Sequence, residues 1–153
     1  MPYLIDGNNL IGLTAGLSLK DARSRQLLVR RICAYQRRKG GKYTVYFDGE
    51  PETGPLRHDL DLRNVAVRFS GRGVTADDMI QRVLRRAAHP REYTVVSSDR
   101  ELARACKELG ARQMSCADFN AQMRKLEAKP LEKWESPVTA AEVEEWLRLF
   151  REK

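Results

Sequence analysis

Apolar positions along this chain fall into short runs that alternate with longer segments of helical spacing. The short apolar runs predict strands at 3–5, 43–47, 65–69 and 93–96, with a further short strand at 112–114. Apolar residues at every third or fourth position predict helices at 21–38, 75–88, 98–109, 117–127 and 139–151. Before the last helix the order is β-α-β-β-α-β-α-β-α, which is typical of an α/β fold: a three-layer α/β/α sandwich around a central, mostly parallel sheet.

Two prolines interrupt this pattern near the end of the chain. Pro130 and Pro137 fall between the last two predicted helices and indicate a linker. The final helix carries an apolar stripe that includes Trp146 and Phe150. We therefore expect one domain over residues 1–128, and a linker with a C-terminal amphipathic helix over 129–153 that packs back onto the domain. Binding of a partner by this helix is the alternative.

The composition indicates a globular protein, with 42% hydrophobic and 32% charged residues in 153. No apolar run approaches the roughly 18 residues of a membrane span, and the first residues lack the features of a signal peptide, so we expect a cytoplasmic protein with no membrane contact. Three cysteines indicate buried thiols rather than a disulfide framework. The chain has only two histidines, which disfavours a zinc site or a histidine-based triad.

The net charge of +7 is unevenly distributed. Residues 1–91 hold 17 Lys and Arg against 9 Asp and Glu, a balance of +8, whereas residues 92–153 hold 11 against 12, a balance of −1. A basic surface around a few acidic residues suits a polyanionic substrate drawn to a metal centre. A basic surface that only keeps the protein soluble is the alternative.

Aspartates stand where three of the predicted strands end. Asp6, Asp48 and Asp99 each follow one of the apolar runs, and Asp77 and Asp78 open a predicted helix. The carboxyl ends of parallel strands meet at one edge of a sheet, so these residues are expected to converge. Clustered carboxylates repel one another unless a cation neutralises them, and Mg²⁺ prefers oxygen ligands. The pattern therefore predicts a metal site.

Each aspartate also has a structural alternative. Asp6 precedes Gly-Asn-Asn, which predicts a turn after the strand in which the carboxylate bonds nearby backbone. Thr75 and Asp78 fit a capping box, which explains Asp78 and leaves Asp77 as the candidate metal ligand. We favour a metal-binding role for Asp6.

A second capping pattern runs from Ser98 to Glu101. It assigns Ser98 as the helix cap and leaves Asp99 free to point into the crevice at the sheet edge. An aspartate before glycine is commonplace in turns, so Asp48 is an accessory candidate, as is Asp78.

Arginines close to these aspartates are candidates for phosphate contacts. Arg72 lies between two glycines shortly before Asp77, Arg82 lies on the helix that follows, and Arg100 comes directly after Asp99. A guanidinium group matches the geometry of a phosphate, so each is a candidate substrate-binding residue. A solvated basic surface is again the alternative.

The motifs YLIDGNNLIG, VYFDG, the helix start from Gly73 to Ile80 and VVSSDREL follow one another in an order and spacing that resembles the NYN domain of the PIN-like nuclease superfamily. The resemblance covers about residues 2–125 and is greatest to the YacP-like bacterial ribonucleases. It implies a PIN-like sandwich, a divalent metal at clustered aspartates and endoribonuclease activity. It also implies that Asp6, Asp77 and Asp99 form the acidic site, with Asn9 as the orienting polar residue and Asp48 as the accessory acid.

We therefore predict a metal-dependent endoribonuclease in which Asp6, Asp77 and Asp99 hold Mg²⁺ or Mn²⁺ and a metal-activated water attacks the RNA phosphodiester. A branch of the resembled family acts on mRNA at translating ribosomes, so mRNA and the ribosome are the partners that the resemblance implies. The alternative is a non-catalytic RNA- or ribosome-binding module of the same fold. A phosphatase of the haloacid type is disfavoured, because Asp6-Gly7-Asn8 lacks the second aspartate of its D-x-D motif.

Overall fold

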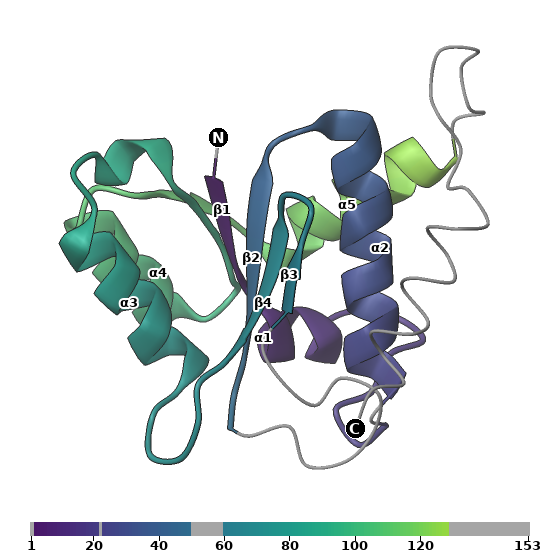
Figure 1. The fold of residues 1–153 in the computed structure, drawn as a ribbon, viewed down its shortest axis with the longest axis horizontal. Coiled ribbons are helices and arrows are strands. Elements are labelled where there is room, and N and C mark those ends of the chain that lie inside the picture. The colour runs from purple at the N-terminus through teal and green to yellow at the C-terminus, as the bar shows by residue number, and fades with distance from the viewer. Residues whose placement is uncertain (1, 22, 50–59, 129–153) are drawn as a thin grey trace.

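The computed structural model describes residues 2–21, 23–49 and 60–128. Its six strands form one sheet in the order β3-β4-β2-β1-β5-β6, with β1, β2, β4, β5 and β6 parallel and β3 antiparallel to β4. Figure 1 shows this sheet in the middle of the domain. The strands are β1 (Pro2–Asp6), β2 (Lys42–Phe47), β3 (Leu60–Leu62), β4 (Val65–Phe69), β5 (Thr94–Val96) and β6 (Arg112–Met114).

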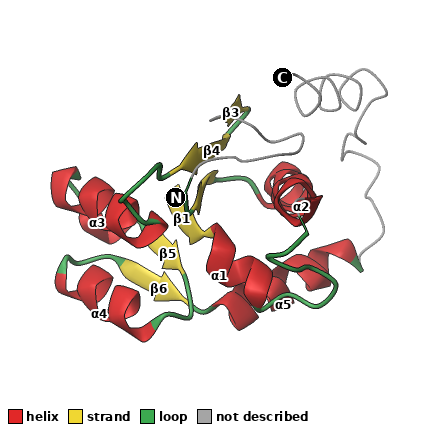
Figure 2. Cartoon of the chain, turned by 90° about the horizontal axis from the view of Figure 1, so that it is seen from below, coloured by secondary structure: helices red, strands yellow, loops and turns green. Residues whose placement is uncertain are grey.

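Helices cover both faces of the sheet, which confirms the predicted three-layer α/β/α fold. In Figures 1 and 2, α3 and α4 lie on one side of the sheet, and α2 and α5 lie on the other with α1. The helices are α1 (Gly7–Gly12), α2 (Arg23–Lys39), α3 (Ala76–Arg86), α4 (Arg100–Glu108) and α5 (Cys116–Glu127), with a 3-10 turn η1 (Pro90–Glu92) before β5.

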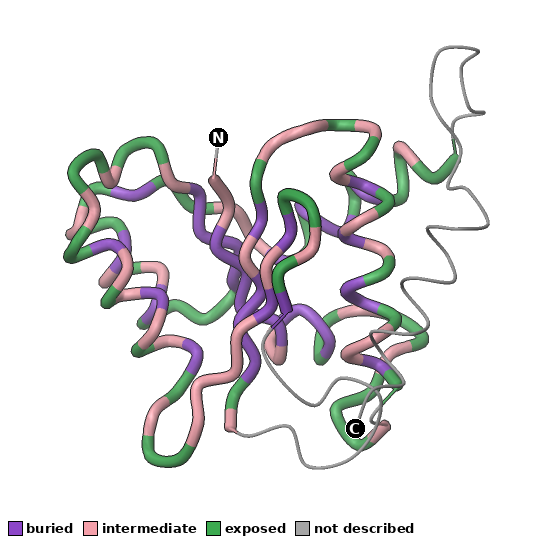
Figure 3. The backbone as a smooth tube through the Cα atoms, in the orientation of Figure 1, coloured by how far each residue is buried: buried purple, intermediate pink, exposed green. Residues whose placement is uncertain are grey.

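The core consists of two apolar clusters, one on each face of the sheet. Ile5 points into the cluster under α1, α2 and α5, and its neighbour Leu4 points into the cluster under α3 and α4. Because both faces of the sheet are covered, the central strands β1 and β5 have consecutive buried residues, whereas β4 alternates and the edge strand β6 is largely exposed. Figure 3 shows the buried residues concentrated in the central strands and in the helix faces turned toward them.

The thiols also lie in this core. Cys106 and Cys116 are buried and Cys33 is half-buried, and none of the three is in a disulfide. Burial raises the pKa of the Cys33 and Cys106 thiols to about 12, so both are protonated near neutral pH. The prediction of structural thiols is confirmed for these residues.

The turn predicted after the first strand was wrong. Residues 7–12 form α1 instead, because Asp6 caps the helix by accepting the backbone N–H of Asn9 at 3.4 Å. Leu10 and Ile11 are fully buried and supply the apolar contact that a helix of six residues needs to persist. The sequence pattern did not show this helix because it is too short to display helical periodicity.

Strand β3 was also missed. It has three residues and is held to β4 by antiparallel pairing, from Leu60 opposite Val67 to Leu62 opposite Val65. The whole predicted linker and C-terminal helix at 129–153 lie outside the described residues. Among the helices of the described ranges, none has the length and apolar character needed to cross a membrane.

Candidate active site

The strand register brings the acidic residues to the carboxyl edge of the sheet. Strands β2, β1 and β5 are adjacent, with Asp6 of β1 opposite Tyr46 of β2 and Ile5 opposite Val96 of β5. The chain leaves β1 toward β2 and later returns across the sheet to β5, so the topology switches direction between β1 and β5. Crevices at such switch points are where open α/β sheets bind ligands. Figure 2 views the domain from this edge.

Asp6 lies at the centre of this edge and is 8% exposed. One of its oxygens, Oδ1, accepts the backbone N–H of Asn9, and the Ser97 hydroxyl lies 3.3 Å from Oδ2. The same hydroxyl accepts the backbone N–H of Asp99 at 3.1 Å. Ser97 therefore connects the end of β1 with the loop that carries Asp99. Sequence reasoning missed Ser97, although its position directly after the buried 94–96 strand was a usable signal.

Asp48 connects the end of β2 with the start of α3. Its Oδ1 accepts the backbone N–H of Ala76 at 2.7 Å, and its own N–H donates to Asn8 Oδ1 at 3.3 Å. The first bond satisfies one of the free N–H groups at the helix N-terminus. Asp48 is thus held beside the residue that precedes Asp77, a link that its turn-like sequence context did not indicate.

The start of α3 has the predicted capping box. Thr75 Oγ1 accepts the N–H of Asp78, and Asp78 Oδ2 accepts the N–H of Thr75, each at 3.1 Å. These bonds lower the pKa of the Asp78 carboxyl, with a smaller contribution from Arg82. Asp77 is half-buried, takes no part in the box, and accepts a hydrogen bond from the Gln81 amide. The prediction that Asp78 belongs to the capping box and Asp77 does not is confirmed.

The predicted capping of α4 was wrong. Asp99, not Ser98, is the N-cap: its Oδ1 accepts the N–H groups of Glu101 at 2.9 Å and Leu102 at 3.4 Å. Ser98 is turned away because its hydroxyl accepts the N–H of Cys116, at the start of α5. The helix therefore begins one residue later, and Asp99 is exposed with one carboxylate oxygen engaged in capping.

Asn9 holds three segments together at this edge. Its Oδ1 accepts the N–H of Ser98 at 2.7 Å and the Cys116 thiol at 3.1 Å, and it lies 3.3 Å from the Ser97 hydroxyl. The amide oxygen is therefore used to fasten the β5–α4 loop and α5 to α1. This places Asn9 beside Asp6, where the resemblance predicted it, with an orienting function toward the protein itself.

Electrostatics single out Asp6. Burial, and then the negative charges of Asp48 and Asp77, raise the pKa of its carboxyl to about 6, against partial compensation by its hydrogen bonds to Asn9 and Ser97. Asp48 has the larger effect of the two charges, and Asp99 is not among the groups that shift this pKa. Asp48 and Asp77 thus act electrostatically on Asp6, and these three residues are here called the acidic group.

The donors in this group suit a hard cation. Carboxylate oxygens are the usual ligands of Mg²⁺, and a cation would relieve the repulsion that raises the pKa of Asp6. Within the ranges that the structure describes, no three His, Cys, Asp or Glu side chains are grouped as a ready-made metal site. Binding an ion would therefore draw in the exposed carboxylate of Asp48 or the half-buried one of Asp77 toward Asp6.

The three predicted phosphate-binding arginines are exposed and lie on separate elements. Arg72 lies in the loop between β4 and α3, flanked by glycines with φ of 79° and 73°, while Arg82 lies on α3 and Arg100 begins α4. The sequence did not single out Arg25 of α2. Its guanidinium lies 5.4 Å from the ring centre of Phe47 and 3.4 Å from the backbone oxygen of Asp48.

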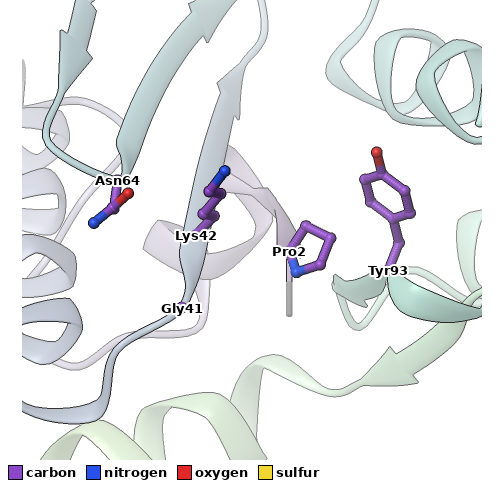
Figure 4. A pocket seen from close by; sticks show the side chains of 5 residues that line it. All are labelled: Pro2, Gly41, Lys42, Asn64 and Tyr93. Atoms are coloured by element: carbon purple, nitrogen blue, oxygen red, sulfur yellow. The ribbon is translucent and has the colours of Figure 1, made fainter.

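A hollow of about 560 Å³ lies at the opposite, amino edge of the sheet (Figure 4). It is lined by Pro2, Gly41, Lys42, Asn64 and Tyr93, at or near the beginnings of four strands. None of the candidate aspartates contributes to it. Because the acidic group lies at the carboxyl ends of the same strands, the hollow and the candidate active site are separate features.

Comparisons with known proteins find the same fold in solved structures. The crystal structure of Rae1 (YacP) from Bacillus subtilis superimposes with a TM-score of 0.69 at 25% identity, over 83% of this chain and 75% of that one. The W164L mutant of the same protein superimposes with a TM-score of 0.63 at 24% identity, over 98% and 92% of the two chains. A comparison with curated proteins found no match.

The family model of the YacP-like NYN domain matches residues 3–148, well beyond the 2–125 range over which motifs were visible. This confirms the resemblance and extends it into the C-terminal part of the chain, where no motif was recognised. A nuclease-like, RNA-related function follows from this match and from the fold shared with Rae1. The chain belongs to the YacP-like NYN domain family.

Proposed function

We propose that this protein is a divalent-metal-dependent endoribonuclease whose active site is the acidic group at the carboxyl edge of the sheet. The observation that carries the proposal is the interaction of Asp48 and Asp77 with the buried Asp6. A buried carboxylate that two other carboxylates repel, at a topological switch point, is unsuited to binding a polyanion alone and is suited to binding it through a cation.

In this proposal Asp6 and Asp77 hold Mg²⁺ or Mn²⁺, and Asp48 and Asp99 are further candidate ligands that follow neighbouring strands. The ion supplies an activated water and neutralises charge on the scissile phosphate. Ser97 and Asn9 keep the Asp6 carboxylate in place, and Asp48 holds the N-terminus of α3 so that Asp77 stays near Asp6. Arg72, Arg82 and Arg100 would contact phosphates on either side of the cleaved bond.

The substrate we propose is single-stranded RNA. Its bases and backbone are accessible without unwinding, which an open sheet edge requires. The idea that the substrate is mRNA on the ribosome comes from the family resemblance, and the similarity to Rae1 supports the nuclease assignment rather than this choice of RNA.

Asp77→Asn tests the function. It removes one charge while keeping the side chain's size, and Asp78→Asn is its matched control because Asp78 has a capping role. We expect Asp77→Asn to lower kcat on a single-stranded RNA by at least about 100-fold, since even the loss of a group that only supports a metal ligand costs about 10- to 100-fold. Asp78→Asn should retain most of the activity. Cleavage would be followed on gels in Mg²⁺, in Mn²⁺ and in EDTA.

Two outcomes contradict the proposal in different ways. Cleavage that survives EDTA, or equal cleavage by wild type and Asp77→Asn, excludes the metal mechanism at these aspartates. RNA binding without turnover under any metal condition identifies the protein as the non-catalytic RNA-binding module instead.

A further inference from the structure

Helix α2 has an unusual charge composition. Its 17 residues, RSRQLLVRRICAYQRRK, include seven Arg and Lys and no acidic residue. An exposed helix in a soluble domain normally mixes both signs, because i,i+4 pairs of opposite charge stabilise it. The absence of any acid on α2 is therefore a cost to helix stability that a function would explain.

Three of these arginines are used to hold α2 on the domain. Arg25 lies over the rings of Phe47 and Phe69, at 5.4 and 5.5 Å from their centres. The other two face α5: Arg31 forms an ion pair with Glu127, and Arg38 donates to the backbone oxygen of Leu126. These contacts fix which side of the helix is turned toward solvent.

The solvent side carries Arg23, Arg30 and Arg37, which are all exposed and are separated by seven residues each. Seven residues are close to two helical turns, so the three side chains form one line, here called the α2 stripe, about 21 Å long. The helix residues between them on this face are Leu27, which is 46% exposed, and Ala34, and neither is acidic. Arg23 is paired with Asp21, which precedes the helix.

The α2 stripe begins at the candidate active site. The helix follows the β1 and α1 segments and precedes β2, so it runs antiparallel to the strands and its first turns lie at their carboxyl edge (Figures 1 and 2). Arg25, in the first turn, reaches the backbone oxygen of Asp48 at 3.4 Å. From there the stripe extends toward the amino edge, away from the aspartates.

We propose that the α2 stripe binds the phosphate backbone of single-stranded RNA and directs the strand to the acidic group. The inference rests on the proposed function and adds the path of the substrate. A stripe of about 21 Å is long enough for about six nucleotides of a stacked strand, at about 3.4 Å each. Charge complementarity selects the occupant, since regularly spaced cations suit a polyanion.

Binding in the absence of metal tests the stripe apart from catalysis. A fluorescein-labelled 20-nucleotide oligouridine would be titrated in EDTA with wild type, with the double variant Arg30→Gln and Arg37→Gln, and with the control double variant Arg104→Gln and Arg124→Gln. The control residues are exposed arginines on α4 and α5 and give the same change in net charge. Circular dichroism and thermal melting would establish that all three proteins are folded.

The expected result has two parts. The stripe variant should bind at least about 10-fold more weakly than the control variant at 50 mM KCl, and its slope of log K against log salt should be shallower by about 1.4, for two lost phosphate contacts on a single strand. The control variant should keep a slope close to that of wild type. Equal weakening in the two variants, or no weakening in the stripe variant, overturns the proposal.

Cleavage gives an independent readout. Wild type should show a lower KM for the 20-nucleotide RNA than for a trinucleotide too short to reach along the α2 stripe, and this advantage should shrink in the stripe variant. Weaker binding by the stripe variant in EDTA, with no metal-dependent cleavage by wild type, would contradict the proposed function and still support RNA binding by the α2 stripe. Metal-dependent cleavage by wild type, with no effect of the stripe substitutions on binding or KM, would support the proposed function and contradict RNA binding by the α2 stripe.

Discussion

At the residue scale, three of the candidate site aspartates also have structural roles. Asp6 caps α1, Asp48 accepts the first N–H of α3, and Asp99 caps α4. A carboxylate has two oxygens and several lone pairs, so one oxygen can hold a helix end while the other remains available to a ligand. Capping therefore explains where these side chains are held and does not remove them from the candidate site.

The raised pKa of Asp6 predicts how stability depends on pH. The carboxyl has a pKa near 3.8 when unfolded and about 6 when folded, so between these values the folded protein binds more protons. Stability should therefore fall as pH rises from about 4 to about 6, by up to about 3 kcal/mol from this group. Chemical denaturation of wild type and Asp6→Asn in EDTA measures it: the variant should lose this part of the pH dependence.

Asp78 is the control, because its pKa is shifted in the direction opposite to that of Asp6. Its pKa is lowered by the bonds to Thr75, so its contribution is present above pH 4 and is lost as the pH falls further. Asp78→Asn should therefore be most destabilised relative to wild type near neutral pH. An Asp6→Asn variant whose stability follows wild type from pH 4 to 7 would show that Asp6 is not held in the folded protein as an uncompensated acid.

At the element scale, α1 determines the shape of the site. It follows β1 without a loop, and its first residue, Gly7, packs directly on β2. A β-carbon on Gly7 would lie 2.5 Å from Cε1 of Phe47 and 2.8 Å from the backbone oxygen of Tyr46. Glycine is needed here for close approach, and that approach brings Asn8 and Asn9 to the ends of β2 and β5.

Gly7→Ala should therefore destabilise the domain, by about 1–3 kcal/mol, because α1 has to move away from β2. Gly12→Ala is the control on the same helix: its added methyl would meet nothing closer than 3.9 Å, and alanine favours the helix. In urea denaturation, the free energy of unfolding of Gly7→Ala should be lower than that of wild type, and that of Gly12→Ala should be equal to or higher than that of wild type. Equal stability of Gly7→Ala and wild type would contradict the close packing of α1.

At the scale of the whole molecule, charges of opposite sign are concentrated in different places: the acidic group lies at the carboxyl edge of the sheet, and α2, whose own sequence holds no acidic residue, carries arginines away from that edge. A cation that binds the folded chain and not the unfolded one stabilises it by mass action. Mg²⁺ at ten times its Kd should therefore add about 1.4 kcal/mol to the free energy of unfolding and raise Tm, and EDTA should reverse this.

The measurement is a thermal melt at increasing Mg²⁺, with wild type, Asp6→Asn and Asp77→Asn compared at one pH. The two variants should lose the rise in Tm, whereas Asp78→Asn should keep it. A rise of the same size in all four proteins would mean that the ion binds elsewhere.

The sequence was sufficient for most elements of the fold. Apolar runs located five of the strands and helical spacing located α2 to α5, because the spacing of apolar residues follows from which faces of an element are buried. The short elements α1 and β3 were missed, since each depends on contacts with distant residues. Leu27 is apolar and yet exposed, because the orientation of α2 is decided by its contacts with the sheet and α5.

For the candidate site, the sequence by itself determined the residue types and their positions at strand ends, and the capping box of Thr75 and Asp78, because both depend only on neighbours along the chain. Only the tertiary structure decided that Asp48 and Asp77 act on Asp6, that Ser97 joins Asp6 to the Asp99 loop, and that Arg25 lies over Phe47. Apart from Ser97 and Asp99, which share a loop, the two partners of each of these contacts lie 22 or more positions apart, and the order in which the strands pair is what brings them together.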